Sequence, residues 1–188
     1  MTFFTNLFSP DTYETFSRSN QEVSGFSKHQ HAWAKRVQKG DRFVCYMTKL
    51  SRWVGVLEVL GECYPDESPL FYPEGDPYVI RFKVCPVVWL PKDQAIPIRE
   101  KHIWDTLSFT KGVEQKSAAW TGKVRISLNK LSDEDGQFLQ SQLLAQQTGG
   151  QRYPVDEDEY RRWLAQKVRR PDKVVPVTVP ADNEGEEP

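Results

Sequence analysis

The feature that most constrains the fold is a series of short runs rich in β-branched and aromatic residues, separated by turns rather than by long helices. Strands are expected at residues 2–8, 42–48, 53–60, 78–90 and 123–128. The short polar link KLSR joins the second and third runs, so these two strands should form a hairpin. Many short strands with few helices between them predict an α+β fold, built on a small, strongly bent sheet or barrel.

Helices are expected between and after these strands. In SPDTY, Pro and Asp stand where a helix begins, so a short helix should follow the first strand, and then a loop through Gly25. HAWAKRVQ predicts a helix over residues 31–38 that carries Trp33 and Val37 on one face. Ser132 is placed to cap a longer final helix.

The chain length of 188 residues suits one domain with an appendage. QQTGGQRY has the composition of a linker, so we expect the domain to end near residue 147 and to fold without the rest. Residues 148–188 would then be this linker, an amphipathic helix over about residues 156–169, and a flexible acidic tail. The tail is also what we would expect before an effector domain, fused or associated, after residue 188.

Targeting signals and cysteine usage indicate an intracellular protein. No apolar run approaches the roughly 20 residues that span a bilayer, and MTFFTNLFSP lacks the basic start and cleavage site of a signal peptide. We therefore expect a cytoplasmic protein with no membrane partner. Cys45, Cys63 and Cys85 are widely spaced and lie in or beside strand-like runs, which favours reduced, buried thiols.

Charge is unevenly distributed, although the formal net charge is only -1. Residues 18–52 contain eight Lys or Arg against two acids, whereas residues 53–80 contain six acids and no Lys or Arg. A local basic stretch of this kind suits a phosphate backbone, and the alternative is an ordinary solvated helix face. The candidate backbone-binding residues are Lys28, Lys35, Arg36 and Lys39.

Catalytic signatures are missing from the sequence. CxxC, GxGxxG, GxxxxGK[ST], HExxH and GxSxG do not occur, and His29 and His31 lack obvious third and fourth metal-binding partners. We therefore expect a non-enzymatic protein with no catalytic residue, no bound metal and no cofactor.

Aromatic residues make up 12% of the chain, and several stand at predicted loops or strand ends. Each of them alone is more simply explained by core packing. Beside a basic stretch, however, aromatic side chains suit a nucleic-acid site, because stacking on a base contributes roughly 1–3 kcal/mol. The aromatics in question are Phe26, Trp53, Phe71, Tyr72, Trp104 and Trp120.

Five short motifs occur in the order typical of one family. They are SPD from residue 9, GFS from residue 25, QKGD from residue 38, GVLEV from residue 55 and YPD from residue 64. Together they resemble the EVE domain family, a PUA-like family related to the YTH readers of modified bases, over about residues 1–144. The chain departs from EVE in lacking the Glu of a Ser-Glu-Pro motif and a Trp in the Gly loop.

The resemblance implies a PUA-like mixed or antiparallel β-barrel flanked by short helices, with a pocket for one flipped, modified base. In the YTH branch a Gly-Val-Trp-Ser loop forms one wall and a loop before the long strand forms another. The matching pocket residues here are Gly25, Phe26, Ser27, Phe71 and Tyr72, together with Trp53 in the neighbouring strand. Extruding a base costs a few kcal/mol, which contacts between the basic residues and phosphates would offset.

Three functions remain open from the sequence. The first is a reader of modified, methylated DNA, such as the targeting domain of a modification-dependent restriction system. The second is an RNA-binding PUA-like or YTH-like module that reads a modified ribonucleotide. The third is a protein-interaction domain that docks through the helix bearing Tyr160, Trp163 and Leu164.

Replacing Lys35, Arg36 and Lys39 together by Gln should weaken binding to modified and unmodified oligonucleotides alike, because phosphate contacts position a ligand without specifying it. The plot of log affinity against log salt should become shallower by about 0.7–0.9 for each phosphate that is no longer neutralised. Titrations at several salt concentrations measure this slope. Equal affinity of the unaltered protein at low and high salt would contradict the electrostatic role.

Overall fold

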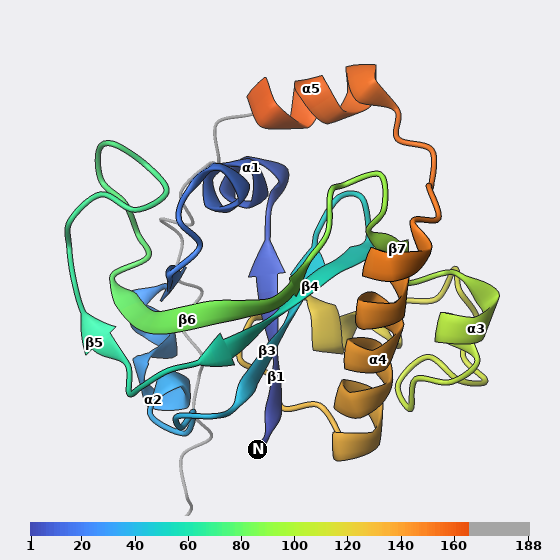
Figure 1. The fold of residues 1–188 in the computed structure, drawn as a ribbon, viewed down its shortest axis with the longest axis horizontal. Helices are drawn as coiled ribbons and strands as arrows, with labels where there is room; N and C mark the ends of the chain where they lie inside the picture. Colours follow the sequence, from blue (N-terminus) through green and yellow to red (C-terminus); the bar gives the residue numbers. More distant parts are fainter. Residues whose placement is uncertain (166–188) are drawn as a thin grey trace, which may run out of the picture.

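A curled mixed sheet forms the centre of the fold in the computed structural model, which describes residues 1–165 (Figure 1). Its strand order is β1-β3-β4-β6-β2, in which β1 is parallel to β3 and the other neighbours are antiparallel. The strands are β1 Phe3–Phe8, β2 Val23–Phe26, β3 Arg42–Met47, β4 Arg52–Val59 and β6 Ile80–Trp89, with β5 Tyr64–Pro65 beside β6 and β7 Ile96–Pro97 beside β4. The α+β fold with a small, strongly bent sheet is confirmed.

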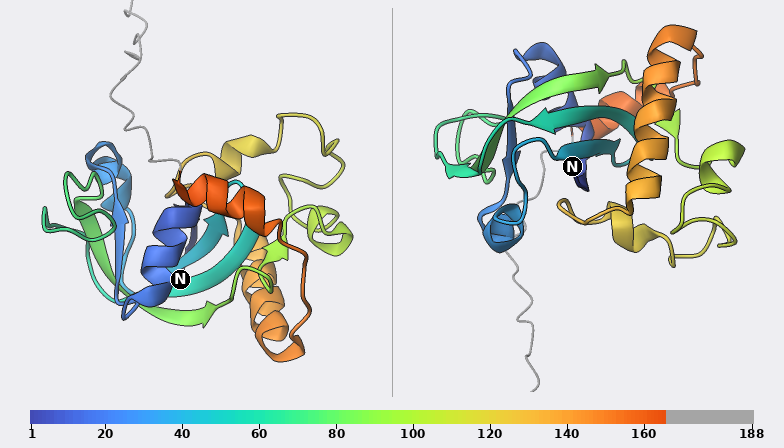
Figure 2. Two further views of the ribbon diagram at one scale, coloured as in Figure 1. Left: turned by 90° about the horizontal axis from the view of Figure 1, so that it is seen from above. Right: turned by 60° about the horizontal axis from the view of Figure 1, so that its bottom comes forward.

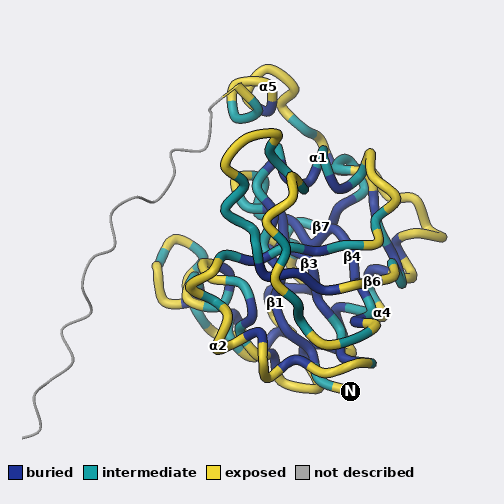
Figure 3. Tube along the Cα trace, turned by 90° about the vertical axis from the view of Figure 1, so that its left-hand side faces the viewer, coloured by how far each residue is buried: buried dark blue, intermediate teal, exposed yellow. Residues whose placement is uncertain are grey.

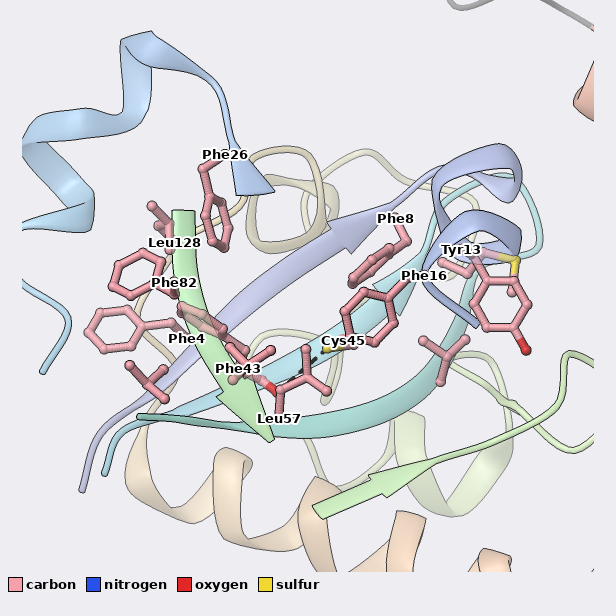
Figure 4. Close-up of a cluster of buried hydrophobic side chains, with 14 of the residues drawn as sticks. Phe4, Phe8, Tyr13, Phe16, Phe26, Phe43, Cys45, Leu57, Phe82 and Leu128 are labelled. Atoms are coloured by element: carbon pink, nitrogen blue, oxygen red, sulfur yellow. Dashed lines mark hydrogen bonds between the residues drawn. The ribbon is translucent and has the colours of Figure 1, made fainter. Parts of the chain in front are cut away.

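Both faces of the central strands are buried (Figure 3). Along β3, Phe43, Cys45 and Met47 point into the curl, whereas Val44 and Tyr46 belong to a second apolar cluster. This follows from the two-residue period of a strand, which sends alternate side chains to opposite faces. The first cluster fills the curl with aromatic rings (Figure 4), and the second lies between the sheet and α4, Asp133–Gly149.

The two edge strands meet where the sheet curls round. The Asn6 side-chain amide donates to the Ser24 hydroxyl at 2.8 Å, and this contact joins β1 to β2. Residues 126–131 run along β1, where the Leu128 amide donates to the Thr5 carbonyl at 2.7 Å. The strand expected at residues 123–128 is nevertheless wrong, because Leu128 has φ +68, which breaks the extended conformation, and a 3-10 turn, η2 Thr121–Val124, precedes it.

The region after the first strand differs in part from the prediction. The expected helix is α1, Pro10–Arg18, but the loop expected through Gly25 contains β2. After η1, Lys28–Gln30, the helix α2 covers only His31–Ala34, so the predicted helix over residues 31–38 was too long.

Early termination of α2 separates the two residues that were expected to share a face. The Asp41 carboxylate accepts the Gln38 amide at 2.8 Å and the Thr2 amide at 2.7 Å, which draws the chain into a turn. As a result Val37 is buried, whereas Trp33 is 40% exposed.

The later helices agree better with the sequence. Ser132 caps α4 as predicted, because its hydroxyl accepts the Asp135 amide at 3.1 Å. The helix α3, Lys101–Trp104, is a single short turn. None of the helices within residues 1–165 is both long enough and apolar enough to cross a membrane.

The three cysteines are free, but their burial differs. Cys45 is buried in the curl, and desolvation raises the pKa of its thiol. Cys63 is partly buried, and Cys85 is exposed on β6, so the expectation of buried thiols is correct only for Cys45.

The helix α5, Glu157–Ala165, packs against α1 (Figure 2). Tyr160 is only 1% exposed, and its hydroxyl donates to the Glu14 carboxylate at 2.9 Å. The segment before α5 is held as well, since the buried Arg52 guanidinium donates to the carbonyls of Lys92 at 2.9 Å and Tyr153 at 3.2 Å. Residues 166–188, which include the rest of the predicted helix and the tail, lie outside the described part.

These contacts change the expected result of shortening the chain. Tyr160→Ala removes a buried ring and should lower the free energy of unfolding by about 3 kcal/mol. Tyr160→Phe keeps the ring and should cost only about 1 kcal/mol. Deleting residues 150–188 should destabilise at least as much as Tyr160→Ala in thermal or urea unfolding. If the shortened chain unfolds at the same temperature and urea concentration as the full-length chain, α5 is dispensable for stability and a domain boundary near residue 147 stands.

Candidate nucleic-acid interface

The loop of residues 66–79, between β5 and β6, is organised around one carboxylate. One oxygen of Asp76 accepts the amides of Leu70 at 2.9 Å and Phe71 at 2.6 Å, and the other accepts the Tyr78 amide at 2.9 Å. A single acidic side chain therefore accepts the hydrogen bonds of loop amides that have no partner in a neighbouring strand.

The same loop is tied to the sheet by Arg81, which is only 3% exposed on β6. Its guanidinium lies 3.0 Å from the Asp66 carboxylate and donates to the Ser68 hydroxyl at 3.0 Å. Hydrogen bonds from Ser68, and to a smaller extent the charge of Arg81, hold the pKa of Asp66 below its usual value. A buried cation paired in this way fixes the start of the loop, because removing Asp66 leaves the desolvated charge of Arg81 without its ion-pair partner.

Glycine at position 25 allows the loop to lie directly on β2. A Cβ atom on Gly25 would be 2.9 Å from the Tyr78 Cβ and 3.0 Å from the Leu70 Cδ2. Gly25 is also opposite Arg81 in the β2–β6 register. The glycine is thus explained by this close approach of backbone and loop.

Two aromatic residues of the loop reach across to the end of β1. The Phe71 ring centroid lies 5.3 Å from that of Tyr78 and 6.4 Å from that of Phe8. Tyr72 stacks on Tyr78 at 6.2 Å, and its hydroxyl donates to the Asp11 carboxylate at 2.6 Å. The other Asp11 oxygen accepts the Ser9 hydroxyl. We call this group the edge cluster: Ser9, Asp11, Gly25, Phe71, Tyr72 and Tyr78.

Protonation of the edge cluster is set by its own contacts. Burial, and then the hydrogen bond to Asp11, raises the pKa of Tyr72 well above its usual value. Burial likewise raises the pKa of Tyr78, with smaller contributions from Asp11 and Asp76. The Tyr72 phenol therefore stays protonated and keeps its donor hydrogen throughout the neutral range.

The sequence matches the EVE domain over residues 5–142. The chain belongs to the EVE domain family. The resemblance proposed from the five motifs is thereby confirmed.

Solved structures share the fold of this EVE domain at low sequence identity. The MmI1 YTH domain has a TM-score of 0.57 at 8% identity, covering 79% of this chain and 99% of that one. The Mmi1 YTH domain in complex with RNA has a TM-score of 0.57 at 8% identity, and the match covers 82% of this chain and 84% of that one. The Pho92 YTH domain in complex with m6A has a TM-score of 0.54 at 12% identity, and the match covers 76% of this chain and 82% of that one. No curated protein has significant sequence similarity to this chain.

The predicted pocket residues divide between the edge cluster and the cores of the EVE domain. Gly25, Phe71 and Tyr72 come together as described. Phe26 is only 1% exposed and lies in the curl, with its ring 5.2 Å from Phe43 and 5.7 Å from Phe82 (Figure 4).

Ser27 and Trp53 have other surroundings. Ser27 is partly buried at the start of η1, where its amide donates to the Gln30 side chain at 3.2 Å. Trp53 is fully buried in the second apolar cluster, 4.9 Å from Tyr46.

Sequence reasoning assigned no site role to several polar members of this region. The sequence indicates Asp11 only as part of a helix start and of the SPD motif, and Tyr78 only as a strand residue. The Asn6–Ser24 pair, 2% and 1% exposed, was not noticed. A signal existed for Asn6, because an Asn within the apolar run FFTNLF must find a partner once that strand is buried.

The predicted backbone-binding residues are exposed on the segment that follows β2. Lys28, Lys35, Arg36 and Lys39 are all exposed, and within residues 1–165 none of them forms an ion pair. This segment follows directly after β2, the strand that carries Gly25 of the edge cluster. No group of three or more metal-ligating side chains is found in the described part of the chain.

A separate groove of about 580 Å³ lies between α1, the end of β6 and α5. It contains none of the predicted site residues. Its three acidic residues are already paired: Glu14 with Arg18 at 3.3 Å, Glu157 with Lys92 at 2.9 Å, and Asp93 with Arg152. The groove thus offers no free charge for a ligand, and we place the candidate interface at the edge cluster.

Gly25→Ala should force the loop of residues 66–79 away from β2. Overpacking of this kind costs about 1–3 kcal/mol, so the melting temperature should fall. Gly61→Ala is the matched control, because no atom lies within 4 Å of a Cβ built there. Equal melting temperatures for the two variants would show that the loop can move away from β2 without loss of stability.

Proposed function

We propose that this EVE domain binds nucleic acid and reads a modified base that is extruded into the edge cluster. Family membership and the shared fold with YTH domains, two of them solved with RNA or m6A, support this class of function. The domain acts by binding alone, and any chemistry on the target belongs to an associated or fused effector. A cytoplasmic location fits such a target.

The observation that carries the proposal is the juxtaposition of the edge cluster with the basic segment. Half-buried aromatic rings and a hydrogen-bonded Asp–Tyr pair lie beside β2 at Gly25, and cations that form no ion pair within residues 1–165 follow in the chain from Lys28. Aromatic faces bury a methyl group and stack on a base by roughly 1–3 kcal/mol. The cations supply affinity for the backbone independent of the base.

Within this proposal Phe71 and Tyr72 form the walls, and the β2 segment at Gly25 and Ser27 borders the base. Phe26 does not contact the base but packs in the curl beneath the site. Trp53 does not contact the base either and packs in the second apolar cluster, on the other face of the sheet. Asp11 reads the base edge. A carboxylate only accepts hydrogen bonds, so it selects an edge with an exocyclic N–H, as in adenine or cytosine derivatives. The bound base takes over the hydrogen bond that Tyr72 gives to Asp11.

Both polymers are compatible with this site. Modified DNA, in a modification-dependent restriction system, is the first candidate from the family resemblance. The YTH structure solved with RNA favours the second, a modified ribonucleotide. The protein-docking alternative is weakened, since Tyr160 is buried against α1, and Trp163 and Leu164 pack partly on the same cluster.

A binding panel tests the proposal directly. It compares unmodified, 5-methylcytosine, 5-hydroxymethylcytosine and N6-methyladenine oligonucleotides, as single- and double-stranded DNA and as RNA. We expect salt-sensitive binding to all of them and tighter binding to one modified base. Equal affinity for every modified and unmodified ligand would overturn the reader function and leave only a general nucleic-acid binder.

Phe71→Ala and Tyr72→Ala should each remove much of the preference for the modified base, which is about 0.8 kcal/mol for a single methyl group, while leaving affinity for the unmodified oligonucleotide nearly unchanged. Phe138→Ala is the control, because Phe138 is also partly buried but packs on the second cluster. Isothermal titration with both ligands gives the two affinities. Unchanged discrimination in both edge-cluster variants, with melting temperatures intact, would place the base elsewhere.

A further inference from the structure

Trp33 is an unusually exposed tryptophan. Its relative exposure is 40%, whereas Trp53, Trp104 and Trp120 are buried and the remaining two are partly buried. At this exposure a substantial part of the large ring remains in water, where it is available to contact a ligand.

The segment that carries Trp33 is firmly placed. The Gln30 side chain donates to the Ser127 carbonyl at 3.1 Å, which ties η1 to the stretch beside β1. Ala34, the next residue after Trp33, is fully buried, as is Val37. The ring therefore projects from an anchored turn rather than from a free loop.

The electrostatic surroundings of Trp33 select its partner. Residues 25–40 contain no Asp or Glu, and four Lys or Arg side chains on this segment are exposed. The exposed His29 and His31 lie on the same two turns. An exposed aromatic ring on a segment whose charged residues are all cations suits a ligand that offers both phosphates and unpaired bases.

We propose that Trp33 is a second stacking site, which takes an unpaired base of the bound strand outside the edge cluster. This inference rests on the proposed function and deepens it. The ligand is then single-stranded, or locally unpaired, along β2 from the edge cluster to α2, because a base within a duplex presents no free face to the ring. Trp33 adds affinity for the strand without reading the modification.

Variants of Trp33 test this site on a single-stranded oligonucleotide, with and without the modified base. Trp33→Ala should weaken binding of both forms about five- to hundred-fold, with an unchanged ratio between them. Trp33→Phe should retain most of the affinity. Ile126→Ala, which removes another exposed apolar side chain, should have no effect. Melting temperatures confirm that each variant is folded.

Abasic substitution at each flanking position of the oligonucleotide locates the stacked base. At one position, the abasic substitution should lower the affinity of the unaltered protein for the oligonucleotide. With that abasic ligand, Trp33→Ala should cause no further loss of affinity. Binding should also shield tryptophan fluorescence from acrylamide in the unaltered protein and not in Trp33→Phe.

The result that overturns the proposal is Trp33→Ala binding single strands as tightly as Ile126→Ala does. Failure of the proposed function would look different. In that case the unaltered protein would show no preference for any modified base, whatever the effect of Trp33.

Discussion

Burial of both faces of the curled sheet is the constraint on which the rest of this EVE domain depends. One face encloses aromatic rings and the other packs under α4, so β3 and β4 are apolar between the Arg42–Glu58 ion pair at one end and Arg52 at the other. With both faces occupied, polar chemistry is confined to the edges and loops. The edge cluster forms where the curl brings β1 and β2 together, which is where backbone and side chains still need polar partners.

The edge cluster in turn depends on two charged anchors that touch no ligand. Asp76 gathers the amides of its loop, and Arg81 fixes the start of that loop to β6. Both are local solutions to unsatisfied backbone groups and buried charge. Together they hold Phe71 and Tyr72 beside β2, so the position of the aromatic rings follows from polar contacts on the far side of the loop.

The sequence predicted the strands well because apolar runs bounded by turn residues have few other solutions. It failed where one side-chain contact or one left-handed residue overrode the local pattern. Asp41 ends α2 early, and the left-handed Leu128 prevents the expected closing strand. For the site, the motif order located the right loops, but it could not tell a core aromatic from an edge aromatic. Phe26 and Phe71 look alike in sequence, and only the curl of the sheet buries the first and leaves the second half-exposed.

The hydrogen bond between Tyr72 and Asp11 has a consequence for selectivity. Because the polar groups of the edge cluster already satisfy one another, a base edge that enters exchanges hydrogen bonds rather than adding them, and the net gain is small. Discrimination then comes from apolar burial of the modification itself. A single methyl group contributes about 0.8 kcal/mol, or roughly a four-fold difference in affinity. On this basis the proposed reader would separate methylated from unmethylated targets only by modest ratios.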